Sequence, residues 1–131
     1  MIESLDIDNL GVIESAHVDF GPRFTVLTGE TGAGKTMVLT SLNLLLGGRA
    51  DPQMVRREGE DETSARASVD GVFSVPLSIA QEIDEMGGAV DDGLLYVSRT
   101  VPLSGRSRAA LGGRAMPASA LSRIIGSLVT I

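Results

Sequence analysis

The octet GETGAGKT at residues 29–36 constrains the fold of this chain more than any other feature. It satisfies the pattern G-x-x-x-x-G-K-[ST] in full, in which glycines let backbone N–H groups converge on an anion. The apolar residues 24–28 before it predict a buried strand. The leucine-rich residues after it predict a helix that begins near Lys35 and is ended by Gly47 and Gly48. A chance match is the competing interpretation, and this strand-to-helix context argues against it.

Each part of the octet has an expected role in binding a nucleoside triphosphate with magnesium. The backbone and the positive end of the helix would stabilise the phosphates. Lys35 would reach the β- and γ-phosphates, and the hydroxyl of Thr36 would ligate Mg²⁺. The predicted cofactor-binding residues are Gly29, Glu30, Thr31, Gly32, Ala33, Gly34, Lys35 and Thr36.

The sequence lacks other groups that phosphoryl transfer needs. In P-loop proteins a second acid on the metal normally ends a strand of four apolar residues, and no such run precedes Asp or Glu after the octet. Lys35 is the only lysine, which excludes the Asn-Lys-x-Asp element of guanine-specific GTPases. The chain alone is therefore predicted to bind ATP without efficient hydrolysis, and no complete catalytic set is expected in it.

The remaining segments predict a mixed α/β plan in one domain. Alternating residues on either side of Asn9, Leu10 and Gly11 predict an antiparallel hairpin. Residues 65–73 and 94–101 predict strands, the former with one solvated face. Polar residues 50–63 have no period and predict an exposed loop.

Helical spacing occurs in three segments. The first helix is expected to bury a stripe formed by Val38, Leu39, Leu42, Leu45 and Leu46. The stretch SVPLSIAQEIDEMGG predicts a second helix with Ser74 as its cap, Pro76 in its first turn and Gly87 as its end. Its inward residues are expected to be Leu77, Ile79, Ala80 and Ile83. The final ASALSRIIGSLVTI predicts a helix to about Ile125 and a strand thereafter.

The segment RSRAALGGRAM at residues 106–116 allows two interpretations. It predicts a hairpin that turns at Gly112 and Gly113, because two glycines tolerate the positive φ of a tight turn. Its basic residues would alternatively mimic the lid of a small-molecule kinase: Arg106, Arg108 and Arg114. Alternation within a hairpin is the favoured interpretation.

Composition narrows the class of protein. The 131 residues are 43 % hydrophobic, and apolar stretches such as LNLLLGG are too short to cross a bilayer, so a soluble intracellular domain is expected. The absence of cysteine excludes disulfides and thiolate metal sites. The net charge of −6 is not that of an autonomous nucleic-acid binder, so DNA would be contacted elsewhere or through a local patch.

Several motifs together carry a family resemblance. GETGAGKT, the helix ending LLLGGRA, VRREG and SRAALGGR resemble the N-terminal part of the RecN family of bacterial DNA double-strand-break repair proteins, relatives of the SMC and Rad50 ATPases. The start LDIDNLGVIESAHVDFGPRF is similar to that family's N-terminal hairpin, and the resemblance spans nearly all of the chain. Thr31 stands where SMC and Rad50 relatives usually have Asn.

The resemblance implies an α/β fold of the P-loop NTPase class. Residues 1–131 would form the N-terminal lobe of an ABC/SMC-like ATPase head, with a mixed β-sheet and an antiparallel β subdomain, and without the coiled coil and C-terminal lobe. ATP and Mg²⁺ are the implied cofactors, with ATPase activity in the assembled head. ATP-linked head dimerisation in recombinational repair is the implied function.

The resemblance also implies partners and one further site residue. The implied partners are the protein's own C-terminal head lobe, a second head in a homodimer, DNA through the full-length protein and the recombinase RecA, with no membrane. The implied location is the cytoplasm, in association with the nucleoid. Arg57 in VRREG stands where SMC-like heads tend to carry an arginine near the nucleotide. Arg56 is an equal candidate, and a solvated loop charge is the other interpretation.

Two other residues and one rival function complete the expectations. His17 and Tyr96 are expected to be structural, because a single histidine on an alternating strand is more often packed or solvated than catalytic. The rival is the nucleotide-binding fragment of a P-loop small-molecule kinase or a regulatory module. A long heptad tract after Ile131 would favour the repair ATPase, and a compact continuation with an acidic substrate site would favour the kinase.

Overall fold

The computed structural model describes residues 2–11, 13–20, 32–55, 66–103 and 106–128, and for residues 32–36 it describes the backbone alone. The elements in chain order are β1 (Ile2–Leu10), β2 (Ile13–Asp19), α1 (Gly32–Leu45), the 3₁₀ helix η1 (Pro52–Met54), β3 (Arg66–Ser74), α2 (Leu77–Glu85), β4 (Leu94–Pro102), β5 (Arg108–Leu111), β6 (Arg114–Met116) and α3 (Ala118–Leu128).

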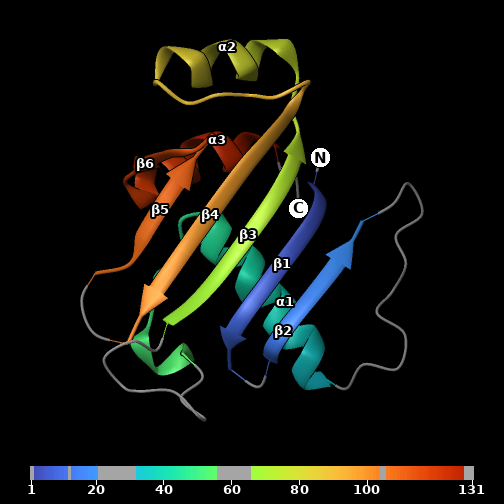
Figure 1. The fold of residues 1–131 in the computed structure, drawn as a ribbon, viewed down its shortest axis with the longest axis vertical. Coiled ribbons are helices and arrows are strands. Elements are labelled where there is room, and N and C mark those ends of the chain that lie inside the picture. Colours follow the sequence, from blue (N-terminus) through green and yellow to red (C-terminus); the bar gives the residue numbers. More distant parts are fainter. Residues whose placement is uncertain (1, 12, 21–31, 56–65, 104–105, 129–131) are drawn as a thin grey trace.

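Six strands form one antiparallel sheet in the order β2-β1-β3-β4-β5-β6. Helices α1 and α3 cover one face of this sheet, whereas α2 lies beyond the ends of β3 and β4 (Figure 1). Every neighbouring pair of strands is also adjacent in sequence order except β1 and β3. The segment between those two strands contains β2 and α1, and α1 packs against one face of the sheet (Figure 1).

The core lies between the sheet and the two helices that cover it. Alternate residues of the strands face this side, as period-2 alternation dictates. The fully buried strand residues include Leu5, Ile7, Phe73, Leu95 and Leu111. The helices contribute Leu44, Leu45, Leu121, Ile124 and Ile125.

Both predicted hairpins are confirmed. The turn between β1 and β2 has positive φ at Asn9 (53°) and Gly11 (56°), which are residues that tolerate this conformation. The turn between β5 and β6 has positive φ at Gly112 (60°) and Gly113 (80°). The strands predicted over residues 65–73 and 94–101 are also present, as β3 and β4.

Helix α1 differs from its prediction in two ways. It begins at Gly32, three residues before the expected start at Lys35. Among the side chains of α1 that the structure describes, those of Ser41, Leu44 and Leu45 are fully buried, whereas Leu39, placed in the predicted stripe, is 60 % exposed. Apolar residues occur on all sides of this helix, so their spacing could not identify the side that packs on the sheet.

Helix α2 also corrects the prediction at its start. Ser74 is not its cap, since Ser74 is the last residue of β3 and pairs with Leu94. The helix begins at Leu77 with Pro76 in extended conformation at the N-cap position, and Val75 is kept out of the helix because it precedes a proline. Leu77, expected inward, is 73 % exposed, and Ile83 is the buried residue of this helix.

The connecting segments contain more structure than predicted. Within the expected loop 50–63, residues 52–54 form η1 and Val55 bridges to Leu10. Helix α3 continues to Leu128 rather than ending near Ile125. The strand predicted after Ile125 is wrong for residues 126–128, which are helical, and residues 129–131 lie outside the described residues, as does the predicted strand at 24–28.

Candidate functional site

The predicted phosphate loop leads into the N-terminal end of α1. Gly29, Glu30 and Thr31 lie outside the described residues, and residues 32–36 form the backbone of the first turns of the helix. The first N–H groups of a helix have no intrahelical acceptor and point along the positive end of its dipole. The first turn of α1 contains no acidic residue that would repel an anion. This end of α1 therefore offers main-chain donors where the sequence predicts phosphate.

The β1–β2 turn packs against the same end of α1. Gly11 lies so close to Met37 that a Cβ at Gly11 would collide with the Met37 Sδ atom. Met37 directly follows Thr36 in the sequence. The close approach and the positive φ of Gly11 together explain why glycine is required in this turn.

The segment that precedes Arg56 is held beside this turn as well. The Gly11 N–H donates a 2.7 Å hydrogen bond to the Met54 carbonyl, and Val55 forms a β-bridge with Leu10. Val55 is only 4 % exposed. Arg56 and Arg57 themselves lie outside the described residues. The structure thus brings together the β1–β2 turn, the start of α1 and Val55.

The C-terminal end of α1 is held by an arginine from a distant strand. Arg99 of β4 donates from Nη1 to the carbonyls of Leu44 and Gly48, both at 2.9 Å. The last turn of α1 contains no basic residue of its own, so Arg99 supplies the cation that favours a helix C-terminus. Ser122 of α3 adds a 2.9 Å hydrogen bond to the Leu46 carbonyl.

Arg99 is a residue that sequence reasoning missed. Its side chain is only 3 % exposed, and burial lowers the pKa of its guanidinium from the ordinary arginine value. The signal was present in the alternation of β4, where Arg99 follows Leu95 and Val97 on the inward side. A charge at an inward strand position indicates a specific buried partner.

The opposite face of the sheet carries a histidine between two carboxylates. His17 bonds through Nδ1 to Asp6 at 2.7 Å and through Nε2 to Asp19 at 2.9 Å. These two hydrogen bonds raise the pKa of His17 above its ordinary value. Asp70 lies directly opposite Asp6 on β3, and partial burial together with the Asp6 charge raises the pKa of Asp70.

Three other residues singled out in the sequence lie on strands, away from the start of α1. Arg108 and Arg114 lie on the two strands of the β5–β6 hairpin, which confirms the hairpin interpretation. Tyr96 is half-exposed on β4. Among the residues that the structure describes, no group of three or more His, Cys, Asp or Glu side chains could hold a metal ion. Within the same ranges, no helix has the length and apolar character needed to span a bilayer.

Comparison with known proteins places this arrangement in context. A family model described as an AAA domain matches residues 4–86. The chain is 50 % identical over 127 residues to the DNA repair protein RecN of Streptomyces coelicolor, covering 95 % of this chain and 21 % of that protein. It is 42 % identical over 139 residues to RecN of Mycobacterium tuberculosis, covering 100 % of this chain and 23 % of that protein. The predicted resemblance to RecN is confirmed, and the chain spans about a fifth of the length of these relatives.

The fold is likewise shared with solved structures. An SMC ATPase studied for ATP-driven dimerization and DNA stimulated activation superposes with a TM-score of 0.71 at 20 % identity, covering 98 % of this chain and 80 % of that one. The predicted fold class, the N-terminal lobe of an ABC/SMC-like head of the P-loop class, is confirmed. The described sheet corresponds to the antiparallel part of that prediction.

Proposed function

This chain belongs to the AAA domain family, and on that premise we propose that it is the ATP-binding lobe of a RecN-like ATPase head that acts in DNA double-strand-break repair. The observation that carries the proposal is the octet at residues 29–36 leading into a helix that begins at Gly32. Residues 1–131 would be the N-terminal lobe, and the rest of the head would lie elsewhere in a longer protein.

The start of α1 suits a magnesium-bound triphosphate. Bound ATP supplies a polyanion and a transferable phosphoryl group, and Mg²⁺ neutralises part of its charge. Residues 29–36 would hold the phosphates through main-chain N–H groups. Lys35 would pair with the β- and γ-phosphates, and the hydroxyl of Thr36 would ligate the metal. The absence of an acid in the first turn of α1 fits a polyanion at this position.

Arg56 and Arg57 are proposed to contribute a cation to the same site. The support is indirect and comes from Val55, which is anchored through Leu10 to the turn that packs on Met37. Consecutive Cα atoms lie about 3.8 Å apart, so both arginines begin within two residues of this anchor.

The far side of α1 supports the proposal that this lobe is incomplete. Leu39 is 60 % exposed on a helix whose described side chains are mostly apolar. Such a helix is usually covered on all sides, and the RecN relatives are far longer than this chain. We expect Leu39→Glu to leave the isolated chain folded but to disrupt the head of the longer protein. Equal folding of the longer variant and wild type, measured by thermal unfolding, would contradict this expectation.

The proposed cycle links ATP to dimerisation. Donors from a second head would complete the site around ATP on the first, so nucleotide binding would favour a homodimer. The same protein's C-terminal lobe would supply the catalytic acid. DNA would be engaged by the full-length protein, with the recombinase RecA as a further partner, in the cytoplasm at the nucleoid. No membrane is involved in this proposal.

A magnesium-dependent titration tests the proposal. Fluorescent ATP is titrated against the wild type and Thr36→Ala, with Mg²⁺ and with EDTA. We expect Mg²⁺ to strengthen binding to the wild type by about 10-fold or more and to have little effect on the variant, because Thr36 holds the metal. Ser41→Ala in the same helix is the matched hydroxyl control. Equal Mg²⁺ dependence of Thr36→Ala and the wild type would refute the assigned role of Thr36.

The rival function is that of a P-loop small-molecule kinase or a regulatory module. It predicts a different oligomeric state for the longer protein when ATP is bound. Analytical ultracentrifugation with a non-hydrolysable ATP analogue distinguishes the two. An ATP-dependent shift from monomer to dimer supports the repair ATPase. A monomer that transfers phosphate to a small acceptor supports the kinase.

A further inference from the structure

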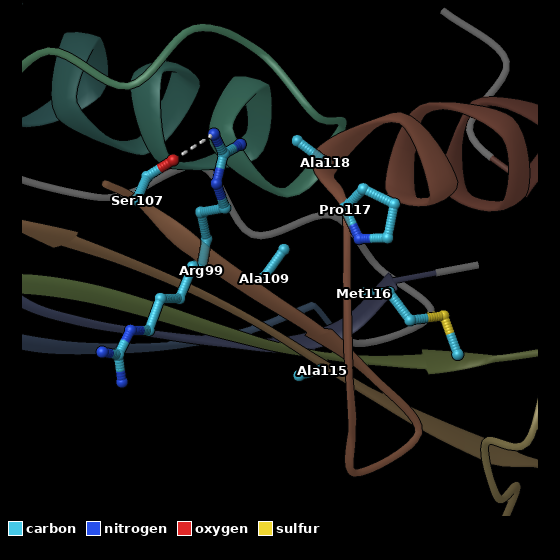
Figure 2. A pocket seen from close by; sticks show the side chains of 8 residues that line it. Arg99, Ser107, Ala109, Ala115, Met116, Pro117 and Ala118 are labelled. Atoms are coloured by element: carbon cyan, nitrogen blue, oxygen red, sulfur yellow. Dashed lines mark hydrogen bonds between the residues drawn. The ribbon is translucent and has the colours of Figure 1, made fainter. Parts of the chain in front are cut away.

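A pocket of about 390 Å³ opens where β4, the β5–β6 hairpin and the start of α3 meet. Figure 2 shows Arg99 rising from the sheet beside it, with the Ser107 hydroxyl pointing at the guanidinium. The lining includes Arg99, Ser107, Ala109, Met116, Pro117 and Ala118. This pocket adjoins the C-terminal end of α1, whereas the proposed phosphate site lies at the other end.

The guanidinium of Arg99 has hydrogen-bonding capacity that its neighbours leave unused. Among the described residues its acceptors are two carbonyls and the Ser107 Oγ, at 3.1 Å, all of them neutral. The Nε–H is buried and has no acceptor among the residues that the structure describes. A buried cation without a counter-ion is costly, and leaving one of its donors unpaired adds to that cost. A carboxylate is the acceptor that best matches the paired N–H groups of an arginine fork.

The surrounding charge favours an anionic ligand. Residues 93–131 contain five arginines and no aspartate or glutamate. The described part of this segment forms β4, β5, β6 and α3, the half of the molecule that surrounds the pocket. An approaching carboxylate would therefore be attracted rather than repelled.

The shape and lining of the pocket select among anions. Its walls are largely apolar, from Ala109, Met116 and Pro117, and it is hollowed into the surface. Duplex DNA presents phosphates on a convex, fully hydrated backbone that meets an exposed basic surface. A protein side chain can enter a hollow and place an apolar neighbour against its walls.

We propose that this pocket binds an aspartate or glutamate side chain that a partner protein presents next to an apolar residue. The carboxylate would accept from the Nη2 group of Arg99, beside Ser107, and would supply the guanidinium with a counter-ion. The same guanidinium holds the Leu44 and Gly48 carbonyls, so occupancy of the pocket would stiffen the C-terminal end of α1. This inference goes beyond the proposed function and does not depend on ATP binding.

The test uses a carboxylate tethered beside Arg99. Ser107→Asp places an acid on the residue that already contacts Nη2, and Ser107→Asn is the neutral control of matched size. The probe is a fluorescein-labelled peptide of alternating leucine and glutamate, compared with its glutamine counterpart by fluorescence anisotropy with the full 131-residue chain. We expect the wild type to bind the glutamate peptide about 10-fold or more tightly than the glutamine peptide.

Three variants test whether the peptide binds in the pocket. Ser107→Asp should weaken binding of the glutamate peptide about 10-fold or more, because its own carboxylate occupies the Arg99 guanidinium. The same carboxylate should raise the Tm. Ser107→Asn should stay within about 2-fold of the wild type. Arg123→Gln removes an exposed charge on α3, away from the pocket lining, and should also have little effect.

Three outcomes would overturn the inference. The first is equal binding of the glutamate and glutamine peptides by the wild type. The second is wild-type affinity for the glutamate peptide in Ser107→Asp with an unchanged Tm. The third is displacement of the peptide by a 20-base-pair DNA duplex whose own binding falls equally in Ser107→Asp and Arg123→Gln, which would identify a general phosphate-binding surface instead.

Discussion

The two ends of α1 are built by different means. At the N-terminal end the groups expected to act are contiguous in sequence, since residues 29–36 provide glycines, a lysine and a threonine in one octet. At the C-terminal end the hydrogen-bond donors come from other elements. Arg99 of β4 donates to the carbonyls of residues 44 and 48, and Ser122 of α3 donates to the carbonyl of residue 46. A motif can therefore reveal the first end, while only the packing of strands and helices creates the second. The following perturbations separate the two ends, beginning with the largest expected effect.

Lys35→Ala breaks the N-terminal end. We expect it to weaken ATP binding by about 1,000-fold, or about 4 kcal/mol, because it removes the cation that pairs with the phosphates. The stability of the nucleotide-free chain should change little. Isothermal titration calorimetry with Mg-ATP measures the first quantity and urea unfolding the second. An unchanged affinity for ATP in the variant would contradict the assigned role of residues 29–36 in nucleotide binding.

Arg99→Met breaks the C-terminal end. We expect a loss of about 3 kcal/mol in the free energy of unfolding, because two carbonyls at the end of α1 lose their charged donor. ATP affinity of the folded variant should change less than about 3-fold if the two ends are independent. Arg123→Met is the control, since the contacts of this exposed residue with Glu82 at 3.7 Å and with the Met86 sulfur at 3.3 Å are weak, and the substitution should cost less than about 0.5 kcal/mol. Equal losses in the two variants, by urea unfolding, would contradict the assigned role of Arg99.

Gly11→Ala sharpens the contribution of the β1–β2 turn to the N-terminal end. An alanine there would be strained at φ 56° and would push against Met37, at a cost of about 2 kcal/mol. Gly113→Ala is the matched control, because Gly113 also has positive φ but has no atom within 4 Å of an added Cβ. We expect Gly113→Ala to cost about 1 kcal/mol. The difference between the two variants in chemical denaturation isolates the contact with α1, and no difference would argue against its importance.

His17→Gln gives the smallest effect and concerns the hairpin rather than α1 itself. The pKa of His17 is raised by Asp6 and Asp19, so protonated His17 stabilises the folded state. This contribution is fully present below the unfolded value of about 6.5 and is lost as the pH rises through the folded pKa. The wild type should therefore exceed the variant in Tm at about pH 5.5 and approach it at about pH 8.5. A Tm difference independent of pH would show that the two carboxylates do not act through the charge of His17.

Local patterns predicted most of the strands and both hairpins. Alternation identified β3 and β4, and residues that tolerate positive φ identified the turns at Gly11 and at Gly112–Gly113. These features depend on neighbours within a few residues, which a sequence displays directly. Helix boundaries were less well predicted, because Ser74 remains in the sheet and Val75 precedes a proline.

The orientation of the helices could not be predicted from spacing. Leu39 and Leu77 were expected inward and are exposed, while Leu44 is fully buried. An apolar residue at a helical position does not indicate which side meets the sheet when apolar residues occur all round. The role of Arg99 was missed for a related reason, since its partners at Leu44 and Gly48 lie more than 50 residues away in sequence.

By itself the sequence determined the octet and the family to which the chain belongs, because phosphate chemistry requires particular residues at fixed spacing. Only the tertiary structure decided which side of α1 is buried, that Val55 is held beside the β1–β2 turn, and that Arg99 closes the other end of the helix. Those features depend on contacts between segments far apart in the chain, whose geometry is set by the packing of the whole sheet against its helices.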